Sequence, residues 1–162
     1  MISFRKLYTW EVKFYKSLFS YISLKQFLGK VAAGTENGIL YIGHLEPPGD
    51  SNGSGGNSTF ESHHNVSEDG INALSYSPDG SLLAIGCQDG IIYVMQDKDP
   101  NETELLRLSG HTAGVSHIDW RKDGISLRSN SIDYELLYWK IVKEDGKEGN
   151  LSFRILNQII HV

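Results

Sequence analysis

The sequence Gly-His-Thr-Ala-Gly-Val-Ser-His-Ile-Asp-Trp-Arg-Lys-Asp-Gly at residues 110–124, followed by Ser-Asn-Ser-Ile-Asp-Tyr-Glu-Leu-Leu-Tyr-Trp at residues 129–139, decides the fold. Side chains at alternate positions of residues 115–120 form two sets, Val, His and Asp in one and Ser, Ile and Trp in the other. This period of two predicts a β-strand, because successive side chains of a strand point to opposite faces. Asp123 and Gly124 then supply residues that tight hairpin turns favour.

A second hairpin follows in the same stretch. Residues 127–131 and 136–141 are predicted to be its two strands, and Ile132–Glu135 to be the turn that joins them. With the strand at 115–120, they give a small antiparallel sheet.

The same pattern recurs earlier in the chain. A shift of 44 residues superimposes five identical residues, which are Gly70 on Gly114, Asp79 on Asp123, Gly80 on Gly124, Leu83 on Leu127 and Asp89 on Asp133. A third copy lies at residues 32–42, which match residues 84–94 at a shift of 52. The additional eight residues are accounted for by the Gly, Ser and Asn run at 50–59, whose composition predicts a loop.

The order of these features resembles that of WD repeats, in which each unit of roughly 40 to 45 residues supplies one four-stranded blade of a β-propeller. We therefore predict an all-β fold, a partial WD-repeat β-propeller with about three four-stranded blades in an open arc. Propellers avoid exposed strand edges by closing a ring, whereas three blades leave both ends open. The arc alone is expected to be marginally stable and prone to association.

The resemblance to WD repeats also implies a buried hydrogen-bonded chain in the last unit. In such repeats a His before the first strand, a Ser on the second, an Asp in the next turn and a Trp on the third are bonded together. By resemblance these places fall to His111, Ser131 (or Ser129), Asp133 and Trp139, with a structural role. Buried polar groups need partners, so the four are expected to act together.

The preceding unit departs from this pattern. Ser67 stands at the position of the His and Met95 at the position of the Trp. We therefore expect this unit to lack the polar chain and to be held by apolar packing alone.

Residues 109–120 and 129–139 resemble one family more closely than WD repeats at large, the echinoderm microtubule-associated protein-like family. There the corresponding segments end in His-Leu-Asp-Trp and in Asp-Tyr-Glu-Ile-Leu-Tyr-Trp. Such proteins carry a coiled coil, a basic region and two fused propellers, and they bind microtubules and soluble tubulin. The resemblance covers residues 31–141 and implies part of the second propeller; this chain has no heptad run.

Five segments follow from the repeats. They are residues 1–29, basic and aromatic; residues 30–64, a degenerate blade with a Gly/Ser-rich loop at 43–64; residues 65–109, a second blade; residues 110–145, the third and most complete blade; and residues 146–162, a divergent C-terminal segment.

Residues 1–29 leave three interpretations open. They supply imperfect strands of the first or a preceding blade, or form a basic amphipathic surface helix, or are non-native sequence at a truncated end. The longest stretch without charge, residues 17–24, is too short to span a bilayer. No extended apolar core with a small-residue cleavage site is present, so a secretory signal is not indicated.

Composition limits the partners and the chemistry. The net charge is −5, and residues 1–30 carry six Lys and Arg against Glu11 alone, so the rest of the chain is acidic. An acidic body disfavours nucleic-acid binding. The single cysteine, Cys87, excludes an internal disulfide framework and fits a reducing compartment. We predict no cofactor and no membrane partner. We also predict no metal site, because His44, His63 and His64 have no Cys or carboxylate at ligand spacing.

The leading hypothesis is a non-catalytic interaction module of a microtubule-associated protein, located in the cytoplasm at the cytoskeleton, which needs further blades or self-association. The alternative is a generic WD-repeat scaffold for partners other than tubulin. An enzyme is disfavoured, because no nucleophile and base appear in a nucleophile-elbow context. Tyr134 and Glu135 are candidates for a partner-facing surface, with a solvated turn as the alternative.

Overall fold

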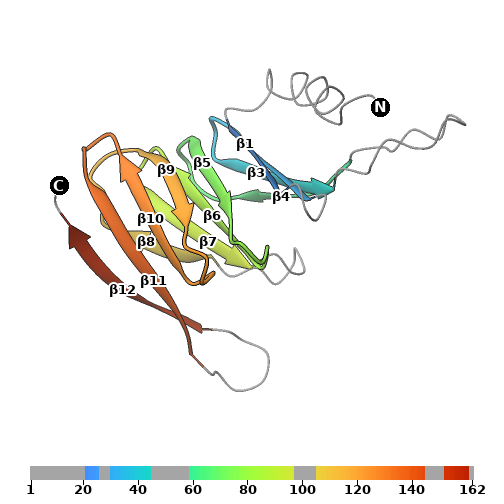
Figure 1. Ribbon diagram of the computed structural model, residues 1–162. Helices are drawn as coiled ribbons and strands as arrows, with labels where there is room; N and C mark the ends of the chain where they lie inside the picture. The colour runs from blue at the N-terminus through green and yellow to red at the C-terminus, as the bar shows by residue number, and fades with distance from the viewer. Residues whose placement is uncertain (1–20, 26–29, 45–58, 97–104, 145–151, 161–162) are drawn as a thin grey trace, which may run out of the picture.

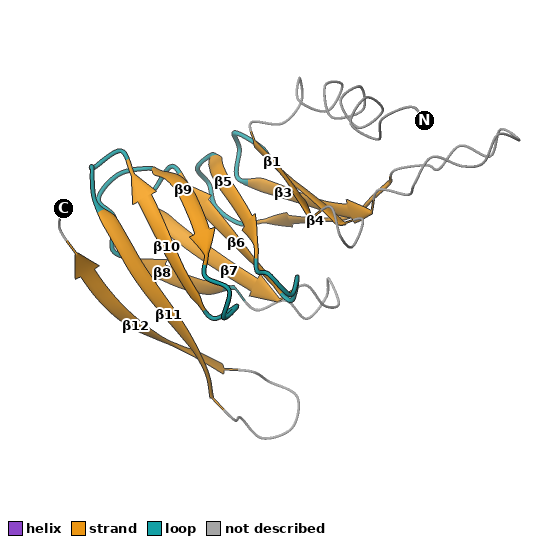
Figure 2. Cartoon of the chain, viewed as in Figure 1, coloured by secondary structure: helices purple, strands orange, loops and turns teal. Residues whose placement is uncertain are grey.

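The computed structural model describes residues 21–25, 30–44, 59–96, 105–144 and 152–160 (Figure 1). All regular secondary structure in these ranges is β-strand (Figure 2). Among the described residues, no helix is long and apolar enough to cross a membrane.

Twelve strands form three four-stranded antiparallel sheets, and consecutive strands are neighbours in each sheet. The first sheet contains β1 (Tyr21–Lys25), β2 (Lys30–Gly34), β3 (Ile39–His44) and β4 (Thr59–Asn65). The second contains β5 (Ile71–Tyr76), β6 (Leu82–Cys87), β7 (Ile91–Gln96) and β8 (Leu106–Ser109). The third contains β9 (Val115–Trp120), β10 (Ser126–Ser131), β11 (Leu136–Glu144) and β12 (Ser152–Ile160).

The sheets follow one another in chain order and form an open stack (Figure 1). Strand β5 packs against β1 and β2 of the first sheet and against β9 of the third. The first strand of each sheet thus faces the next sheet, as in neighbouring propeller blades. This arrangement confirms the predicted all-β class and partial propeller.

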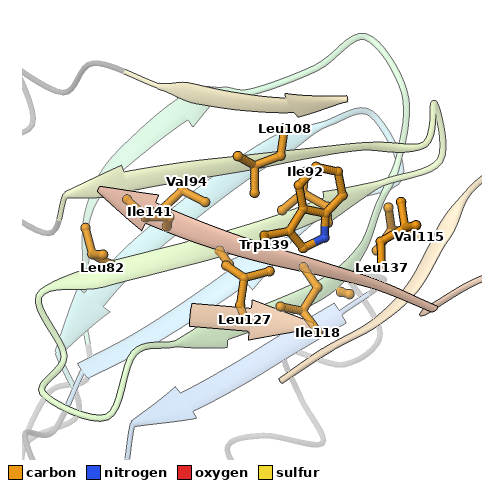
Figure 3. Packing of buried hydrophobic residues seen from close by; sticks show 12 residues of the cluster. Leu82, Ile92, Val94, Leu108, Val115, Ile118, Leu127, Leu137, Trp139 and Ile141 are labelled. Carbon is orange, nitrogen blue, oxygen red and sulfur yellow. The ribbon is translucent and has the colours of Figure 1, made fainter. Parts of the chain in front are cut away.

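Two apolar clusters hold the sheets together. The second sheet contributes buried residues to both clusters, because successive side chains of a strand point to opposite faces of the sheet. The cluster between the first and second sheets contains Ala32, Leu40, Val66, Ile71, Leu74, Tyr76, Leu83, Ile85, Cys87 and Met95. The cluster between the second and third contains Ala73, Leu82, Ala84, Ile92, Val94, Leu108, Val115, Ile118, Leu127, Leu137, Trp139 and Ile141. Figure 3 shows Trp139 among these side chains.

Glycine allows the close approach of consecutive sheets. A Cβ atom added to Gly34 would lie 2.5 Å from Ile71, and one added to Gly86 would lie 2.6 Å from Val115. Both contacts are closer than real Cβ atoms make. The position therefore needs a residue without a side chain wherever another sheet packs in this way.

The hairpins are closed by the Asp-Gly pairs predicted from the sequence. Gly80 and Gly124 have positive φ angles of 76° and 70°. The carboxylate of Asp79 accepts hydrogen bonds from the Ser77 hydroxyl at 2.6 Å and from the Ser81 backbone N–H at 3.1 Å. These local bonds fix the turn, as Asp commonly does in tight turns.

Two features differ from the sequence-based expectations. Residues 59–64 were expected to belong to a loop, but they form most of β4, which pairs with β3. The loop was expected because these residues include polar ones such as His63 and His64, which an outer strand tolerates. Strand β9 has a bulge: Asn130 pairs with His117 and Ser131 with Val115, so Ser116 is skipped. Val115 and Ile118 are consequently both buried, although simple alternation places them on opposite faces.

The ends of the described chain also contribute strands. Residues 21–25, within the N-terminal segment of open interpretation, form β1, and residues 152–160, within the divergent C-terminal segment, form β12. The remaining residues of these segments, and the loop at 45–58, lie outside the described residues.

Candidate functional site

A buried hydrogen-bonded chain links β10 and β11 of the third sheet to the loop before β9 and to the turn between β10 and β11. The Trp139 indole Nε1 donates to the Ser129 Oγ at 2.8 Å, and the Ser129 Oγ lies 2.7 Å from the His111 Nε2. The His111 Nδ1 lies 3.2 Å from the Asp133 Oδ2. We refer to these four residues as the polar chain; it brings together His111, Asp133 and Trp139 as the sequence predicted.

The direction of the bonds follows from what each group can donate. Because an indole N–H only donates, the Ser129 oxygen accepts from Trp139. The arrangement that gives every group a partner has the Ser129 hydroxyl donating to His111 Nε2 and the His111 Nδ1–H donating to the Asp133 carboxylate. Every polar group of the chain is therefore paired, which makes burial of the ring tolerable.

Asp133 also fixes the surrounding backbone. Its carboxylate accepts the backbone N–H of Thr112 at 2.9 Å and of Glu135 at 2.8 Å. Burial pushes the pKa of Asp133 upward, but the hydrogen bonds from Glu135 and Thr112, together with His111, hold the pKa below its usual value. The carboxylate thus ties the entry to β9 to the turn between β10 and β11.

The hydroxyl of the polar chain belongs to Ser129, which corrects the assignment of that place to Ser131. Both residues lie on the same face of β10, because they are two positions apart, so periodicity alone does not separate them. Ser131 instead donates to the Ala113 carbonyl oxygen at 2.8 Å and accepts the Asp133 N–H at 3.3 Å. It therefore braces the loop before β9.

His111, Asp133 and Glu135 are the one group of three potential metal ligands in the described part of the chain, with ligand atoms within 4.8 Å of one another. The chemistry of the group does not favour a cation. Both ring nitrogens of His111 already take part in hydrogen bonds, and its side chain has no exposed surface. The same pairing and burial leave the imidazole no direct contact with a substrate.

A shortened version of the polar chain exists in the second sheet, which corrects the expectation that apolar packing alone holds it. The Ser67 hydroxyl donates to the Asp89 Oδ2 at 3.1 Å, and the Ile91 N–H donates to Oδ1 at 2.9 Å. At the shift of 44, Ile85 and Met95 take the places of Ser129 and Trp139 and are buried. The second sheet thus keeps the hydrogen bond to the turn carboxylate, whereas the places of Ser129 and Trp139 are taken by apolar side chains.

A second indole joins two sheets. Trp120 on β9 donates its Nε1–H to the Ser75 carbonyl oxygen on β5 at 2.9 Å. Trp120 also packs against the apolar cluster of the second and third sheets. No sequence pattern predicts this bond, because it depends on how the sheets stack.

The predicted partner-facing residues differ in their surroundings. Tyr134 is 95% exposed and is the non-glycine residue with positive φ, 66°, in the described chain. At the shift of 44 it corresponds to Gly90, whose added Cβ would lie 2.9 Å from the backbone oxygens of His111 and Ala113. Glu135 is half-buried beside the polar chain. The geometry therefore presents Tyr134 to solvent much more fully than Glu135.

The face of the third sheet that points away from the second sheet carries charged side chains, whereas the equivalent face of the second sheet is apolar. Arg128 Nη2 and Asp119 Oδ2 lie 2.8 Å apart, and His117 Nε2 lies 3.2 Å from Asp119 Oδ1. The Arg128 hydrogen bond holds the pKa of Asp119 below its usual value, and His117 adds to this effect. His117 is an exposed rim residue with a carboxylate neighbour.

Comparison with known proteins agrees with this architecture. The family model described as WD domain, G-beta repeat (WD40) matches residues 57–94. The match begins just before β4 of the first sheet and ends in β7 of the second, so the sequence repeat is shared between two neighbouring sheets. One sequence repeat therefore supplies strands to two neighbouring sheets and connects them through the backbone.

Curated relatives carry the resemblance further. Echinoderm microtubule-associated protein-like 3 of Homo sapiens is 41% identical over 73 residues, which are 44% of this chain and 8% of the relative. Echinoderm microtubule-associated protein-like 1 of Rattus norvegicus is 40% identical over 78 residues, 47% of this chain and 10% of the relative. Echinoderm microtubule-associated protein-like 2 of Homo sapiens is 37% identical over 78 residues, 47% of this chain and 12% of the relative.

The match spans about a tenth of the length of these relatives. The repeat match and the relatives confirm the resemblance to WD repeats and to this group of proteins. The chain carries WD-repeat sequence in a stack of propeller-type sheets and is similar to the echinoderm microtubule-associated protein-like proteins.

Proposed function

We propose that this chain is a non-catalytic WD-repeat interaction module that contributes to binding of tubulin or microtubules at the cytoskeleton. The observation that carries the proposal is the similarity of about half of the chain to three proteins named as microtubule-associated. The polar chain supports a structural and not a catalytic role for His111 and Asp133, because their side chains are hydrogen-bonded to each other.

The contact surface that we propose is the turn between β10 and β11. Tyr134 and Ile132 are exposed there, with 95% and 59% of their surface accessible. Tyrosine is enriched at protein interfaces, and an exposed aromatic in a strained backbone conformation is a reason to suspect a contact role. Glu135 stands beside them as a second, half-buried candidate.

Co-sedimentation with polymerised tubulin tests the proposal. The full 162-residue chain, and a longer product that contains it, are pelleted with increasing tubulin, and the bound fraction is measured. We expect saturable binding by the longer product and weaker binding by this chain. Absence of binding by both would leave the generic WD-repeat scaffold as the function.

Tyr134→Gly separates binding from folding. Glycine relieves the positive φ, so we expect the free energy of unfolding to rise by about 1 kcal/mol. If Tyr134 contacts tubulin, the same variant binds less tightly although it is more stable. Tyr138→Ala, which removes an exposed tyrosine from the outer face of the third sheet, is the matched control and should bind as the unmodified chain does.

A further inference from the structure

The junction between the first and second sheets contains a hollow of about 850 Å³ that the proposed function does not use. Its first-sheet lining comes from the turn before β3, from β3 and from the end of β4. Its second-sheet lining comes from the loop before β5, the turn between β6 and β7, and strands β7 and β8, with Ser67, Asp89, Tyr93 and Arg107 among the residues. The hollow lies at the corner that corresponds, at the shift of 44, to the polar chain of the third sheet.

The equivalent corner of the third sheet is occupied by a side chain. There the imidazole of His111 fills the corner and its Nδ1 lies 3.2 Å from the Asp133 carboxylate. In the second sheet Asp89 occupies the equivalent place, held by the Ile91 N–H at 2.9 Å, but the short side chain of Ser67 replaces the ring. A carboxylate accepts about four hydrogen bonds, so Asp89 has capacity beyond these two.

The lining of the hollow has a net negative charge. Glu68, Asp69 and Asp89 carry carboxylates, and Arg107 is the one cation among the lining residues. Burial, followed by the charges of Asp89 and Asp69, raises the pKa of the Cys87 thiol next to this corner to about 12. The three carboxylates against one cation in the lining favour a positively charged occupant.

Apolar walls complete the hollow. Val66 is buried, and Ile39, Ile91 and Tyr93 are half-buried along its sides. A long side chain with an apolar stem and a planar cationic head matches such a lining, because arginine stacks on aromatic rings and donates several N–H groups to carboxylates.

We propose that this hollow binds an arginine side chain of a partner protein, which donates N–H hydrogen bonds to Asp89 in the place that His111 takes at Asp133. The binding site is distinct from the turn at Tyr134, and it does not depend on whether the partner is tubulin.

The test introduces a side chain that fills the hollow. Binding of a fluorescein-labelled hexa-arginine peptide to the full chain is measured by fluorescence anisotropy at about 0.15 M salt, where attraction between distant charges is screened. Ser67→His places a ring in the corner, so we expect affinity to fall at least about tenfold while the unfolding midpoint stays equal or rises. Ser116→His, on the exposed part of β9, is the matched control and should bind like the unmodified chain.

Charge variants provide a second measurement that does not depend on the folding of Ser67→His. Neutralising the exposed rim carboxylates by Glu68→Gln with Asp69→Asn should weaken binding several-fold, and Arg107→Gln should strengthen it. Undiminished binding by Ser67→His, or by the Glu68→Gln/Asp69→Asn variant, would overturn the proposal. Equal binding of a hexa-glutamate peptide would do the same.

Discussion

Ser129 is the residue on which the polar chain converges, because its single hydroxyl serves both the Trp139 indole and the His111 ring. Ser129→Ala leaves two buried polar groups without a partner. We expect a loss of about 2 to 4 kcal/mol in the free energy of unfolding, measured by urea titration.

Ser131→Ala is the matched comparison on the same face of β10. It removes bonds to backbone groups at the loop before β9, so a loss of about 1 kcal/mol is expected. A larger loss for Ser131→Ala than for Ser129→Ala would restore Ser131 to the polar chain and contradict the geometry.

Acid should weaken the fold through its turn carboxylates. The hydrogen bond from Ser77 lowers the pKa of Asp79 from 3.8 to about 2, with burial opposing this and Ser81 adding to it. The folded pKa of Asp79 is thus below the unfolded one, so its contribution is complete above about pH 4 and is lost as the pH falls toward 2. The pKa of Asp133 is lowered as well and acts in the same direction.

The measurement is urea unfolding at a series of pH values between 2 and 6. We expect stability to be flat in the upper part of this range and to decline below about pH 4. Asp79→Asn should be less stable at pH 6 and should show a shallower acid decline. A variant with the same slope as the unmodified chain would show that Asp79 is not responsible.

At the scale of residues, the sequence motif predicted three of the four members of the polar chain. His111 and Asp133 were identified by their fixed order around the strands, and Trp139 by its place at the end of the motif. Ser129 and Ser131 were not separable, because residues two apart on a strand share a face and only the register decides which one meets the indole. The bulge at Ser116 was equally hidden, since it depends on pairing with β10.

At the scale of elements, the contact between sheets depends on a glycine at a fixed place on the second strand. Gly86→Ala brings a methyl group against Val115, so we expect a loss of about 1 to 3 kcal/mol from overpacking. Asn130→Ala alters the corresponding position of the third sheet, which is exposed, and should change stability by less than about 0.5 kcal/mol.

Urea titrations of these two variants measure the difference between a packed face and an uncovered one. Equal effects of Gly86→Ala and Asn130→Ala would show that the second and third sheets do not approach as closely as described.

The inner strands of the second sheet were predicted better from the sequence than the outer strand β4 of the first sheet. β5, β6 and β7 occupy the residues expected from the repeats, because each is buried on one or both faces and keeps a clear apolar pattern. The pattern is much weaker in the outer strand β4, which carries several polar residues and is recognised from its pairing with β3.

At the scale of the molecule, the stack is asymmetric. The face of the second sheet that meets the third carries Ala84, Ile92 and Val94, all buried. The equivalent positions of the third sheet are Arg128, Leu136 and Tyr138, and Arg128 is paired with Asp119. A sheet that packed there would meet the side chain of Asn130 where the other junctions have glycine.

The central claim is that the second and third sheets are stacked and that the third is pinned by the polar chain. The indole N–H groups of Trp120 and Trp139 report on both halves of this claim, since Trp120 donates to Ser75 across the junction and Trp139 donates to Ser129 within the sheet. Hydrogen exchange of the indole protons, followed by NMR on the full chain, measures them together.

We expect the Trp120 and Trp139 indole protons to be strongly protected and to exchange at a common rate, that of unfolding of the stack. Fast exchange of the Trp139 proton in the folded protein would contradict the polar chain, and slow exchange of Trp139 with fast exchange of Trp120 would contradict the stacking of the two sheets.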